Sequence, residues 1–262
     1  MFRTVAPPPP DFAGKRVIVT GGSRGIGAAI VQRFLDGGAD VVATARSATE
    51  QTPQRATFIA GDVSTLTGVR ALTAAALEAL GGVDVLINNA GAARTHLGGT
   101  STIPDEEWLD ALNLNYLSAV RVTGELLPTL RETGPGAAIV NISSGAALTA
   151  PPLLAHYGAA KAALNAYGKA LATELAPEGI RVTTVVPGTV LTPGADAIRQ
   201  DIADATGASL AETTADVTAA IPLGRPGDPR DVAEAVAYLA SDRAQWVTGV
   251  TLAVDGGQLP GI

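Results

Sequence analysis

The 262-residue sequence contains no cysteine, which excludes disulfide bridges and thiolate metal ligands. This absence is typical of proteins kept in a reducing compartment, and we expect a cytoplasmic location. No run of about 18 consecutive apolar residues occurs, so the sequence predicts no membrane-spanning segment. The N-terminal residues lack the apolar stretch of a secretory signal, so no signal peptide is expected.

Basic residues are also in short supply. The 18 Lys and Arg residues stand against 25 Asp and Glu residues, and the resulting net charge of −7 disfavours a role in binding nucleic acid. Apolar residues make up 47% of the chain, which allows one large core or two small ones. Because no linker follows residue 14, we expect a proline-rich arm over residues 1–12 and a single domain over residues 13–262.

One glycine-rich segment stands between a predicted strand and a predicted helix. An apolar strand over residues 15–20 is followed by Gly21-Gly22-Ser23-Arg24-Gly25-Ile26-Gly27 and then by a helical pattern. This order is typical of a phosphate site, because glycines let the backbone approach the phosphate and the helix N-terminus supplies N–H donors. The alternative is an ordinary tight turn with a helix cap.

Apolar, β-branched runs alternate with helical patterns along the whole chain. The alternation predicts an α/β fold, with a doubly wound parallel sheet covered by helices on both faces. We expect seven strands, over residues 15–20, 40–45, 56–61, 83–88, 138–142, 181–186 and 249–254. We expect helices over residues 26–35, 65–80, 105–130, 155–176 and 229–240, the third being interrupted or bent near Pro128. The long segment 193–223 contains several glycines and acidic residues and predicts a mobile lid over the substrate.

Two residues of the predicted helix over 155–176 indicate acid–base chemistry. Tyr157 and Lys161 are four positions apart, which places them on one helix face. The Lys161 ammonium would favour the phenolate and lower the pKa of Tyr157 toward a range useful for proton transfer. Ser144, just after the strand over 138–142, would hold the oxygen that gains or loses the proton. The alternative is a helix that carries an exposed tyrosine and an exposed lysine.

The order and spacing of these segments resemble the short-chain dehydrogenase/reductase family. The resemblance extends from about residue 14 to residue 258 and is carried by Thr20 to Gly27, Asn88-Asn89-Ala90-Gly91, Ser144, Tyr157-x-x-x-Lys161, Pro187-Gly188 and Val254-Asp255-Gly256-Gly257. The sequence is similar to the β-ketoacyl-carrier-protein reductases and related carbonyl reductases. The resemblance implies a single-domain Rossmann fold, a nicotinamide cofactor and a small carbonyl or alcohol substrate. It also implies a homotetramer built through the helices over 105–130 and 155–176 and the C-terminal strand.

The resemblance assigns roles to individual residues. Tyr157 would be the acid–base group, Ser144 would hydrogen-bond the substrate oxygen, and Lys161 would bind the nicotinamide ribose. Asn115 would anchor a proton-relay water, although without the resemblance it is simply a polar residue inside a helix. The residues expected to bind the cofactor are Gly21, Ser23, Arg24, Gly25, Ile26, Gly27, Arg46, Ser47, Asp62, Val63, Asn88, Ala90, Gly91, Tyr157, Lys161, Pro187, Gly188, Val190 and Thr192.

Other polar residues have structural interpretations. Asn88 and Asn89 can form a turn that bridges backbone groups, whether or not they also line the cofactor. Asp255 is expected to be structural. The two histidines, His96 and His156, are expected to be loop or rim residues, and no metal ligand is expected.

The end of the second strand bears on the choice of cofactor. An NAD-selective site needs a carboxylate there, whereas this strand ends in Ala45 followed by Arg46, with no acid near it in the sequence. In the NADP-dependent members that the sequence resembles, basic residues at the end of the second strand and in the glycine segment bind the 2′-phosphate. Arg46 and Arg24 stand at these two places. We therefore predict NADP(H), while noting that Arg24 alone can be a solvated side chain.

No motif encodes the substrate. We expect it between the loops over 92–100 and 145–156 and the segment 193–223, against an apolar wall that includes Leu148, Pro151, Leu153 and Leu154. Two functions remain open: an NADP(H)-dependent oxidoreductase, and a non-catalytic nucleotide-binding redox sensor or regulator with the same fold. The presence of Ser144, Tyr157 and Lys161 together favours the enzyme.

Overall fold

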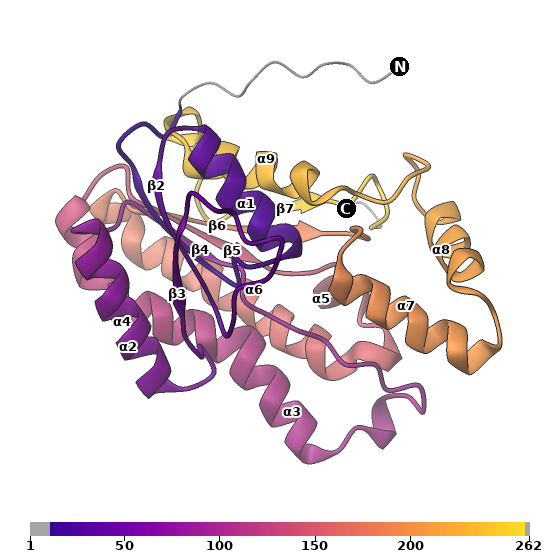
Figure 1. The fold of residues 1–262 in the computed structure, drawn as a ribbon. Coiled ribbons are helices and arrows are strands. Elements are labelled where there is room, and N and C mark those ends of the chain that lie inside the picture. Colours follow the sequence, from indigo (N-terminus) through magenta and orange to yellow (C-terminus); the bar gives the residue numbers. More distant parts are fainter. Residues whose placement is uncertain (1–10, 260–262) are drawn as a thin grey trace.

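The computed structural model of the chain describes residues 11–259 (Figure 1). Within them, seven strands form one parallel sheet in the order β3-β2-β1-β4-β5-β6-β7. The strands are β1 (Arg16–Thr20), β2 (Asp40–Ala45), β3 (Thr57–Ala60), β4 (Val85–Asn88), β5 (Ala138–Ile142), β6 (Arg181–Pro187) and β7 (Thr251–Val254). The predicted doubly wound α/β fold is confirmed, and the strand order reverses between β1 and β4.

Helices cover both faces of the sheet (Figure 1). One layer consists of α1 (Gly25–Asp36) and α9 (Pro229–Ala240), and the other of α2 (Leu66–Leu80), α4 (Ser118–Thr133) and α6 (Ala155–Leu175). The remaining α-helices are α3 (Asp105–Leu112), α5 (Ala146–Thr149), α7 (Pro193–Thr206) and α8 (Leu210–Ala219). Within the described residues, no helix has both the length and the hydrophobicity that a membrane span requires.

Each strand divides its side chains between two apolar cores. In β1, Val17 and Val19 belong to the core beneath α1 and α9, whereas Ile18 belongs to the core beneath α2, α4 and α6. All three side chains are fully buried. A strand covered on both faces requires a continuous apolar run, which explains why the runs in the sequence predicted the strands well.

The predicted helix over 105–130 is divided, but not at Pro128. A π-helical turn, Asn113–Leu117, separates α3 from α4, and α4 continues through Pro128 to Thr133. A proline clashes with the carbonyl group four residues earlier. Here that residue is Gly124, which is exposed and has open space around it, so its peptide group can adjust. The predicted interruption at Pro128 is therefore wrong, whereas a bend there stays a prediction, and the irregular turn surrounds Asn115 instead.

The proline-rich arm expected over residues 1–12 lies outside the described residues except for its last two positions. The Phe12 side chain is 1% exposed, and its ring meets that of Phe34 in α1 edge-on, with 4.5 Å between centroids. The Asp11 carboxylate accepts a 2.8 Å hydrogen bond from Arg243. Asp11 and Phe12 thus belong to the folded domain, because Phe12 helps to close the core beneath α1.

The predicted lid over 193–223 consists mainly of α7 and α8, which Figure 1 shows beyond one end of the sheet. Thr192 begins α7 by accepting a 3.2 Å hydrogen bond from the N–H of Ala195. Ser209 and Glu212 begin α8 as a reciprocal capping box. Both helices have regular N-terminal caps, so the segment is locally ordered, and its opening and closing remain a prediction.

Candidate active site

The predicted catalytic residues gather at the carboxyl ends of β4 and β5, which are neighbours in the sheet. Ser144 comes two residues after β5, and Tyr157 and Lys161 lie on the first turns of α6. In an open parallel sheet, ligands bind outside this edge, close to the point where the strand order reverses. The fold therefore places the three residues at the edge where a binding site is expected.

Lys161 is held rigidly below this edge. The residue is 3% exposed, and its Nζ donates a 2.8 Å hydrogen bond to the carbonyl oxygen of Ile142, the last residue of β5. Burial lowers the pKa of Lys161 from 10.5 to about 8, because the charged ammonium loses its water. An ammonium has three N–H donors, so two remain for another partner.

The pKa of Tyr157 is raised, whereas the sequence predicted a lowered one. Burial raises the pKa of the phenol, and a hydrogen bond with Ser144 opposes this change only in part. The Lys161 ammonium was expected to lower this pKa, but its Nζ is directed at Ile142 and lies 5.8 Å from the centroid of the Tyr157 ring. The expected lowering is not met in this structure, and the phenol keeps its proton at neutral pH.

Asn115 fastens the segment after β4 to the π-helical turn. It is 2% exposed, and its Nδ2 donates 3.0 Å hydrogen bonds to the carbonyl oxygens of Ala92 and Ala111. Its Oδ1 accepts a 3.0 Å hydrogen bond from the N–H of Ala92. The bond to Ala111 takes the place of a regular helical bond, which accounts for the irregular turn. Both Nδ2 protons are used within the protein, and an anchoring role toward water remains a prediction.

Gly91 leaves space between Asn115 and Lys161. A methyl group added at Gly91 would stand 2.8 Å from Asn115 Oδ1 and 3.2 Å from Lys161 Nζ. Only glycine therefore keeps this part of the edge open. The structure brings together three residues that lie far apart in the sequence and that the resemblance had placed in one site.

The glycine segment forms the predicted turn from β1 into α1. Gly21 and Gly25 adopt φ angles of +67° and +56°, which favour glycine. A side chain on Gly27 would stand 2.1 Å from the carbonyl oxygen of Gly21, so glycine is needed for the helix to begin this close to the strand.

The first turn of α1 keeps hydrogen-bond donors for an anion. Arg24, the residue before the helix, makes no side-chain cap. The N–H of Gly25 donates to Oε1 of Gln51 at 3.0 Å, and that of Ala28 to the carbonyl oxygen of Arg24 at 3.2 Å. Among the described residues this leaves the N–H groups of Ile26 and Gly27, at the positive end of a helix. The turn thus fits a phosphate group.

No sequence signal marks the residues that support this turn from one side. The Oγ1 atoms of Thr49 and Thr52 donate to the carbonyl oxygen of Ser23, at 2.6 and 3.2 Å. Both lie in the loop between β2 and β3 together with Gln51. Thr and Gln are ordinary loop residues, and only the folded backbone shows that this loop returns to the glycine turn.

Asn89 supports the turn from the other side. Its Nδ2 donates to the carbonyl oxygens of Thr20 and Gly21, at 3.0 and 3.1 Å. The Thr20 hydroxyl in turn accepts 3.0 Å hydrogen bonds from the N–H groups of Asn89 and Ala90. The backbone-bridging interpretation of Asn89 is therefore correct, and the segment after β4 is locked to the glycine turn.

Three residues expected to contact the cofactor point their side chains elsewhere. Asn88 is 4% exposed, and its Nδ2 donates 3.0 Å hydrogen bonds to Thr123 Oγ1 and Asn141 Oδ1, so it has the structural role. Val63 and Val190 are buried side chains of the two cores. They can offer a ligand only their backbone, because a β-branched side chain cannot leave the core cheaply.

Arg24, Arg46 and Ser47 are exposed, and no ion pair engages either arginine within residues 11–259. One acid nevertheless lies within electrostatic range of Arg46. The pKa of Asp62 is lowered by hydrogen bonds from the Ser64 hydroxyl and N–H and, more weakly, by the charge of Arg46. Ala45 pairs with Ala60 across β2 and β3, which brings these positions together although they are far apart in the sequence.

The segment after β6 lies beside the glycine turn. The Thr192 methyl group is 3.4 Å from the point where a side chain on Gly25 would begin, and the N–H of Gly188 donates to Val254 at 3.0 Å. Pro187 ends β6 and is buried. Asp255 accepts hydrogen bonds from the N–H groups of Gly257 and Leu259, at 2.9 and 2.8 Å, and so has the structural role that was expected.

Apolar side chains lie exposed on the three segments expected to meet the substrate. They are Leu97 (53% exposed), Leu148 (58%), Leu210 (37%) and Leu223 (72%), and Leu191 (48%) lies just before the third segment. Arg94, in the first of these segments, forms an ion pair with Glu107. His156 is neither a loop nor a rim residue, since it lies on α6 and is 2% exposed. The exposed leucines support an apolar substrate wall, with Leu97, Leu191 and Leu223 in addition to Leu148.

Known proteins resemble this chain over nearly its whole length. A family model described as enoyl-(acyl carrier protein) reductase matches residues 21–258. The 3-oxoacyl-(acyl-carrier-protein) reductase of Vibrio cholerae is 36% identical, covering 94% of this chain and 98% of that protein. The L-rhamnose 1-dehydrogenase (NAD(P)(+)) of Azotobacter vinelandii is 37% identical, covering 93% and 96%. The structure of L-sorbose reductase from Gluconobacter frateurii, complexed with NADPH and L-sorbose, has a TM-score of 0.87 and 31% identity, covering 96% and 98%.

Proposed function

Because this chain belongs to the short-chain dehydrogenase/reductase family and is therefore a nicotinamide-dependent oxidoreductase, we propose that it uses NADP(H) to interconvert a carbonyl compound and a secondary alcohol. One observation carries the proposal. The phenol of Tyr157, hydrogen-bonded with Ser144, stands above the buried Lys161 at the carboxyl edge of the sheet. A proton donor, a second hydrogen-bonding group and a fixed cation are thus within one small region.

The residues present fit a dinucleotide. The N–H groups of Ile26 and Gly27 suit the pyrophosphate, and the open position at Gly91 leaves room beside Lys161. Lys161 keeps two donors, which suit two ribose hydroxyls. Arg24 and Arg46 are exposed and form no ion pair within residues 11–259. They suit a 2′-phosphate, since each guanidinium can donate two parallel hydrogen bonds. When bound, the nicotinamide supplies or accepts the hydride.

Tyr157 has the role of acid in reduction and of base in oxidation. Its raised pKa keeps the phenolic proton available for a carbonyl oxygen that gains negative charge. The Oγ of Ser144 accepts a 3.2 Å hydrogen bond from the N–H of Ala146, which orients the hydroxyl and leaves its own proton to donate. Ser144 can therefore bind the same substrate oxygen and stabilise its charge.

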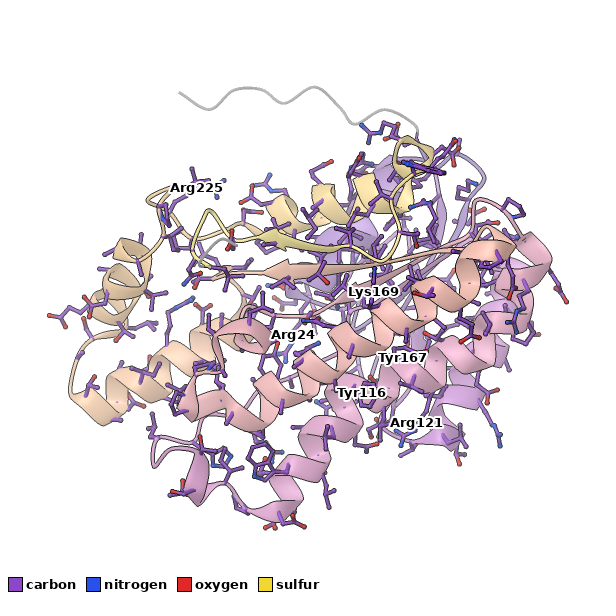
Figure 2. All side chains as sticks on the ribbon, turned by 180° about the vertical axis from the view of Figure 1, so that it is seen from behind. Arg24, Tyr116, Arg121, Tyr167, Lys169 and Arg225 are labelled. Carbon is purple, nitrogen blue, oxygen red and sulfur yellow. The ribbon has the colours of Figure 1, made fainter. Side chains whose placement is uncertain are left out.

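The exposed aromatic surface supports a homotetramer. Trp246 is fully exposed (101%) and Val250 is 37% exposed, both just before β7 at one edge of the sheet, and Tyr238 on α9 is 40% exposed. Tyr116 of the π-helical turn and Tyr167 of α6 are half-buried, and their rings meet edge-on with 6.1 Å between centroids (Figure 2). Apolar and aromatic groups at a bare sheet edge favour association with another copy of the chain.

A screen of carbonyl compounds tests the proposed function. The purified protein is incubated with NADPH or NADH and with β-ketoacyl thioesters, ketoses and ketosteroids, and loss of the reduced-nicotinamide absorbance is followed. We expect turnover of at least one class, and we expect the Tyr157→Phe variant to lose it. Tight cofactor binding without turnover of any compound above the rate of Tyr157→Phe would support the redox-sensor alternative instead.

A further inference from the structure

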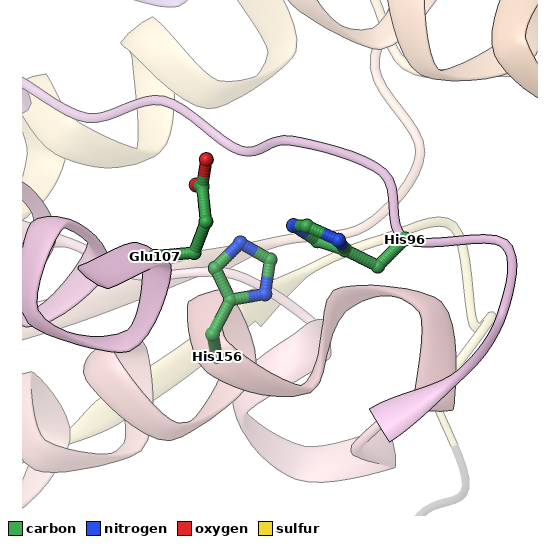
Figure 3. Close-up of side chains that lie close together, drawn as sticks. All are labelled: His96, Glu107 and His156. Atoms are coloured by element: carbon green, nitrogen blue, oxygen red, sulfur yellow. The ribbon is translucent and has the colours of Figure 1, made fainter. Parts of the chain in front are cut away.

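Three side chains from separate segments converge next to the active site (Figure 3). His96 lies in the loop after β4, Glu107 on the first turn of α3, and His156 on the first turn of α6, beside Tyr157. One ligand atom of each residue lies within 4.8 Å of the other two. We propose that His96, Glu107 and His156 form a site for a divalent transition-metal ion of the Zn²⁺ class.

The imidazole nitrogens of this cluster are not satisfied by the protein. Nε2 of His96 and Nδ1 of His156 are buried and have no hydrogen-bond partner among the described residues. The two rings pack edge-to-face, with 5.0 Å between centroids, and Trp108 packs against His156. This packing explains the position of the rings, but it leaves buried polar atoms without partners, which costs free energy. A bound ion would satisfy a histidine nitrogen that is now unpaired.

The donor set suits zinc rather than magnesium or calcium. Two imidazoles and one carboxylate are the ligands of many zinc sites, with a fourth position left for water. Metal binding requires both imidazoles to be neutral.

The ligand atoms have to draw closer when a metal binds. With bonds of about 2.0–2.1 Å, ligand atoms around a tetrahedral ion are roughly 3.3 Å apart, so any separation close to the 4.8 Å limit has to shrink. Among the described residues, two hydrogen bonds join the loop that carries His96 to the segment Pro152–Leu154: the His96 N–H to Leu153 bond of 3.0 Å and the Thr100 hydroxyl to Pro152 bond of 3.3 Å. We therefore expect the ion to pull this loop toward α3 and α6 and to stabilise the folded protein.

Arg94 would compete with a metal ion for the Glu107 carboxylate. Its guanidinium pairs with the Glu107 carboxylate at 2.5 Å, and its side chain is 68% exposed whereas that of Glu107 is 19% exposed. A metal ion has to displace this arginine before Glu107 can bind it. Removing Arg94 should therefore strengthen metal binding, and the gain should disappear when His96 is also replaced by Gln, whereas non-specific binding to acids would keep it.

Metal titration of the whole protein tests the proposal. Chelator-treated protein is titrated with Zn²⁺ by calorimetry, and with Co²⁺ while its visible absorbance is recorded. We expect one ion per chain, at least about tenfold weaker binding in His96→Gln and in Glu107→Gln, and tighter binding in Arg94→Ala. Glu106→Gln is the matched control, since Glu106 is exposed on the same turn and lies outside the cluster. His156 is not replaced first, because it is buried and its loss can disturb the fold.

Two results would overturn the site. The first is the absence of saturable binding in the wild-type protein up to millimolar Zn²⁺. The second is equal affinity in the wild type and in both Gln variants, with each variant shown to be folded by circular dichroism. Neither measurement uses turnover, so failure of the metal site is distinguishable from failure of the proposed function.

Discussion

Lys161 directs its ammonium at the carbonyl oxygen of Ile142, 2.8 Å away. The same nitrogen is 5.8 Å from the centroid of the Tyr157 ring. The cation is therefore fixed to the end of β5, and the proton affinity of the phenol is controlled by burial and by Ser144. At neutral pH this arrangement keeps the phenol protonated, which is the state that the proposed reduction of a carbonyl group requires.

The pH dependence of the two reaction directions should differ. Because burial places the pKa of Tyr157 above 10, the phenol is protonated at neutral pH. For reduction, kcat/KM should be level from about pH 6 to 7.5 and fall at higher pH, where Lys161 with its pKa of about 8 loses its charge, whereas for oxidation it should rise by up to about tenfold per pH unit from pH 6 to 8. Rate profiles in both directions provide the test. A plateau in oxidation below pH 8 would show that the pKa is lowered when the cofactor is bound.

Removing the phenolic hydroxyl should abolish turnover while leaving the cofactor site intact. We expect Tyr157→Phe to lower kcat by roughly a thousandfold and to leave the dissociation constant for the cofactor within about threefold, since the ring still fills its place. Tyr167→Phe is the matched control on the same helix, because Tyr167 hydrogen-bonds Thr123 instead. Fluorescence titration with NADPH and steady-state kinetics measure both quantities. A Tyr157→Phe enzyme with near-normal kcat would remove Tyr157 from the mechanism.

The strands and main helices were predictable because they depend on local pattern. A buried parallel strand such as β5 requires an unbroken apolar run, and the run over 138–142 is the observed strand. The residues around Tyr157 and Lys161 were also predictable, since their helical spacing fixes a shared face. The turn at Asn115 was not, because it depends on hydrogen bonds to Ala92, which follows a different strand.

The sequence could not predict the directions of several side chains or the pKa shifts of the site residues. Asn88 ends a strand and was expected near the cofactor, but the sheet turns its amide toward Asn141 of the adjacent strand. The meeting of His96 and His156 depends on how a loop without regular structure lies on α6. The lowered pKa of Lys161 and the raised pKa of Tyr157 depend on burial depth, which only the packed structure supplies.

Trp246 should be part of a subunit interface. Its side chain is fully exposed next to β7, the edge strand of the sheet. We expect the wild-type protein to have the mass of a tetramer and Trp246→Glu to have half that mass or less, because a buried carboxylate is unfavourable. Light scattering coupled to size-exclusion chromatography at micromolar concentration measures this. Leu66→Glu, at an exposed position (44%) on α2, is the control, and a monomeric wild type would contradict the proposal.

The burial of Lys161 should make stability depend on pH. Its pKa is about 8 in the folded protein and about 10.5 when unfolded, so the unfolded chain binds more protons between these values. The free energy of unfolding should therefore rise with pH from 8 to 10.5, by at most about 3 kcal/mol, and be lowest below pH 8.

The variant Lys161→Met isolates this contribution. The free energy of unfolding of the variant minus that of the wild type should be larger at pH 7 than at pH 10, even though the variant also loses the hydrogen bond to Ile142. Urea unfolding of both proteins at equal concentration measures the two differences. Parallel pH dependences would mean that the ammonium is not penalised by burial.

The choice between NADPH and NADH should depend on Ala45 and Arg46. No carboxylate stands at the end of β2 to receive the ribose diol of NADH, and Arg46 is exposed and makes no ion pair with the rest of the described chain. Asp62 lies close enough to feel the charge of Arg46, but its carboxylate already accepts a hydrogen bond from the Ser64 N–H at 2.9 Å. Arg46 is thus available to a 2′-phosphate.

We therefore predict that NADPH is preferred over NADH by at least about tenfold in kcat/KM, which needs only about 1.4 kcal/mol. The double variant Ala45→Asp/Arg46→Ala should reverse the preference, since it adds an acceptor for the diol and removes the phosphate ligand. Arg55→Ala is the matched control, because Arg55 lies near the end of the same loop but pairs with Asp36. Steady-state kinetics with both cofactors decide the matter. Equal or better efficiency of the wild type with NADH would refute the NADP(H) assignment, because the two exposed arginines would then contribute nothing to cofactor choice.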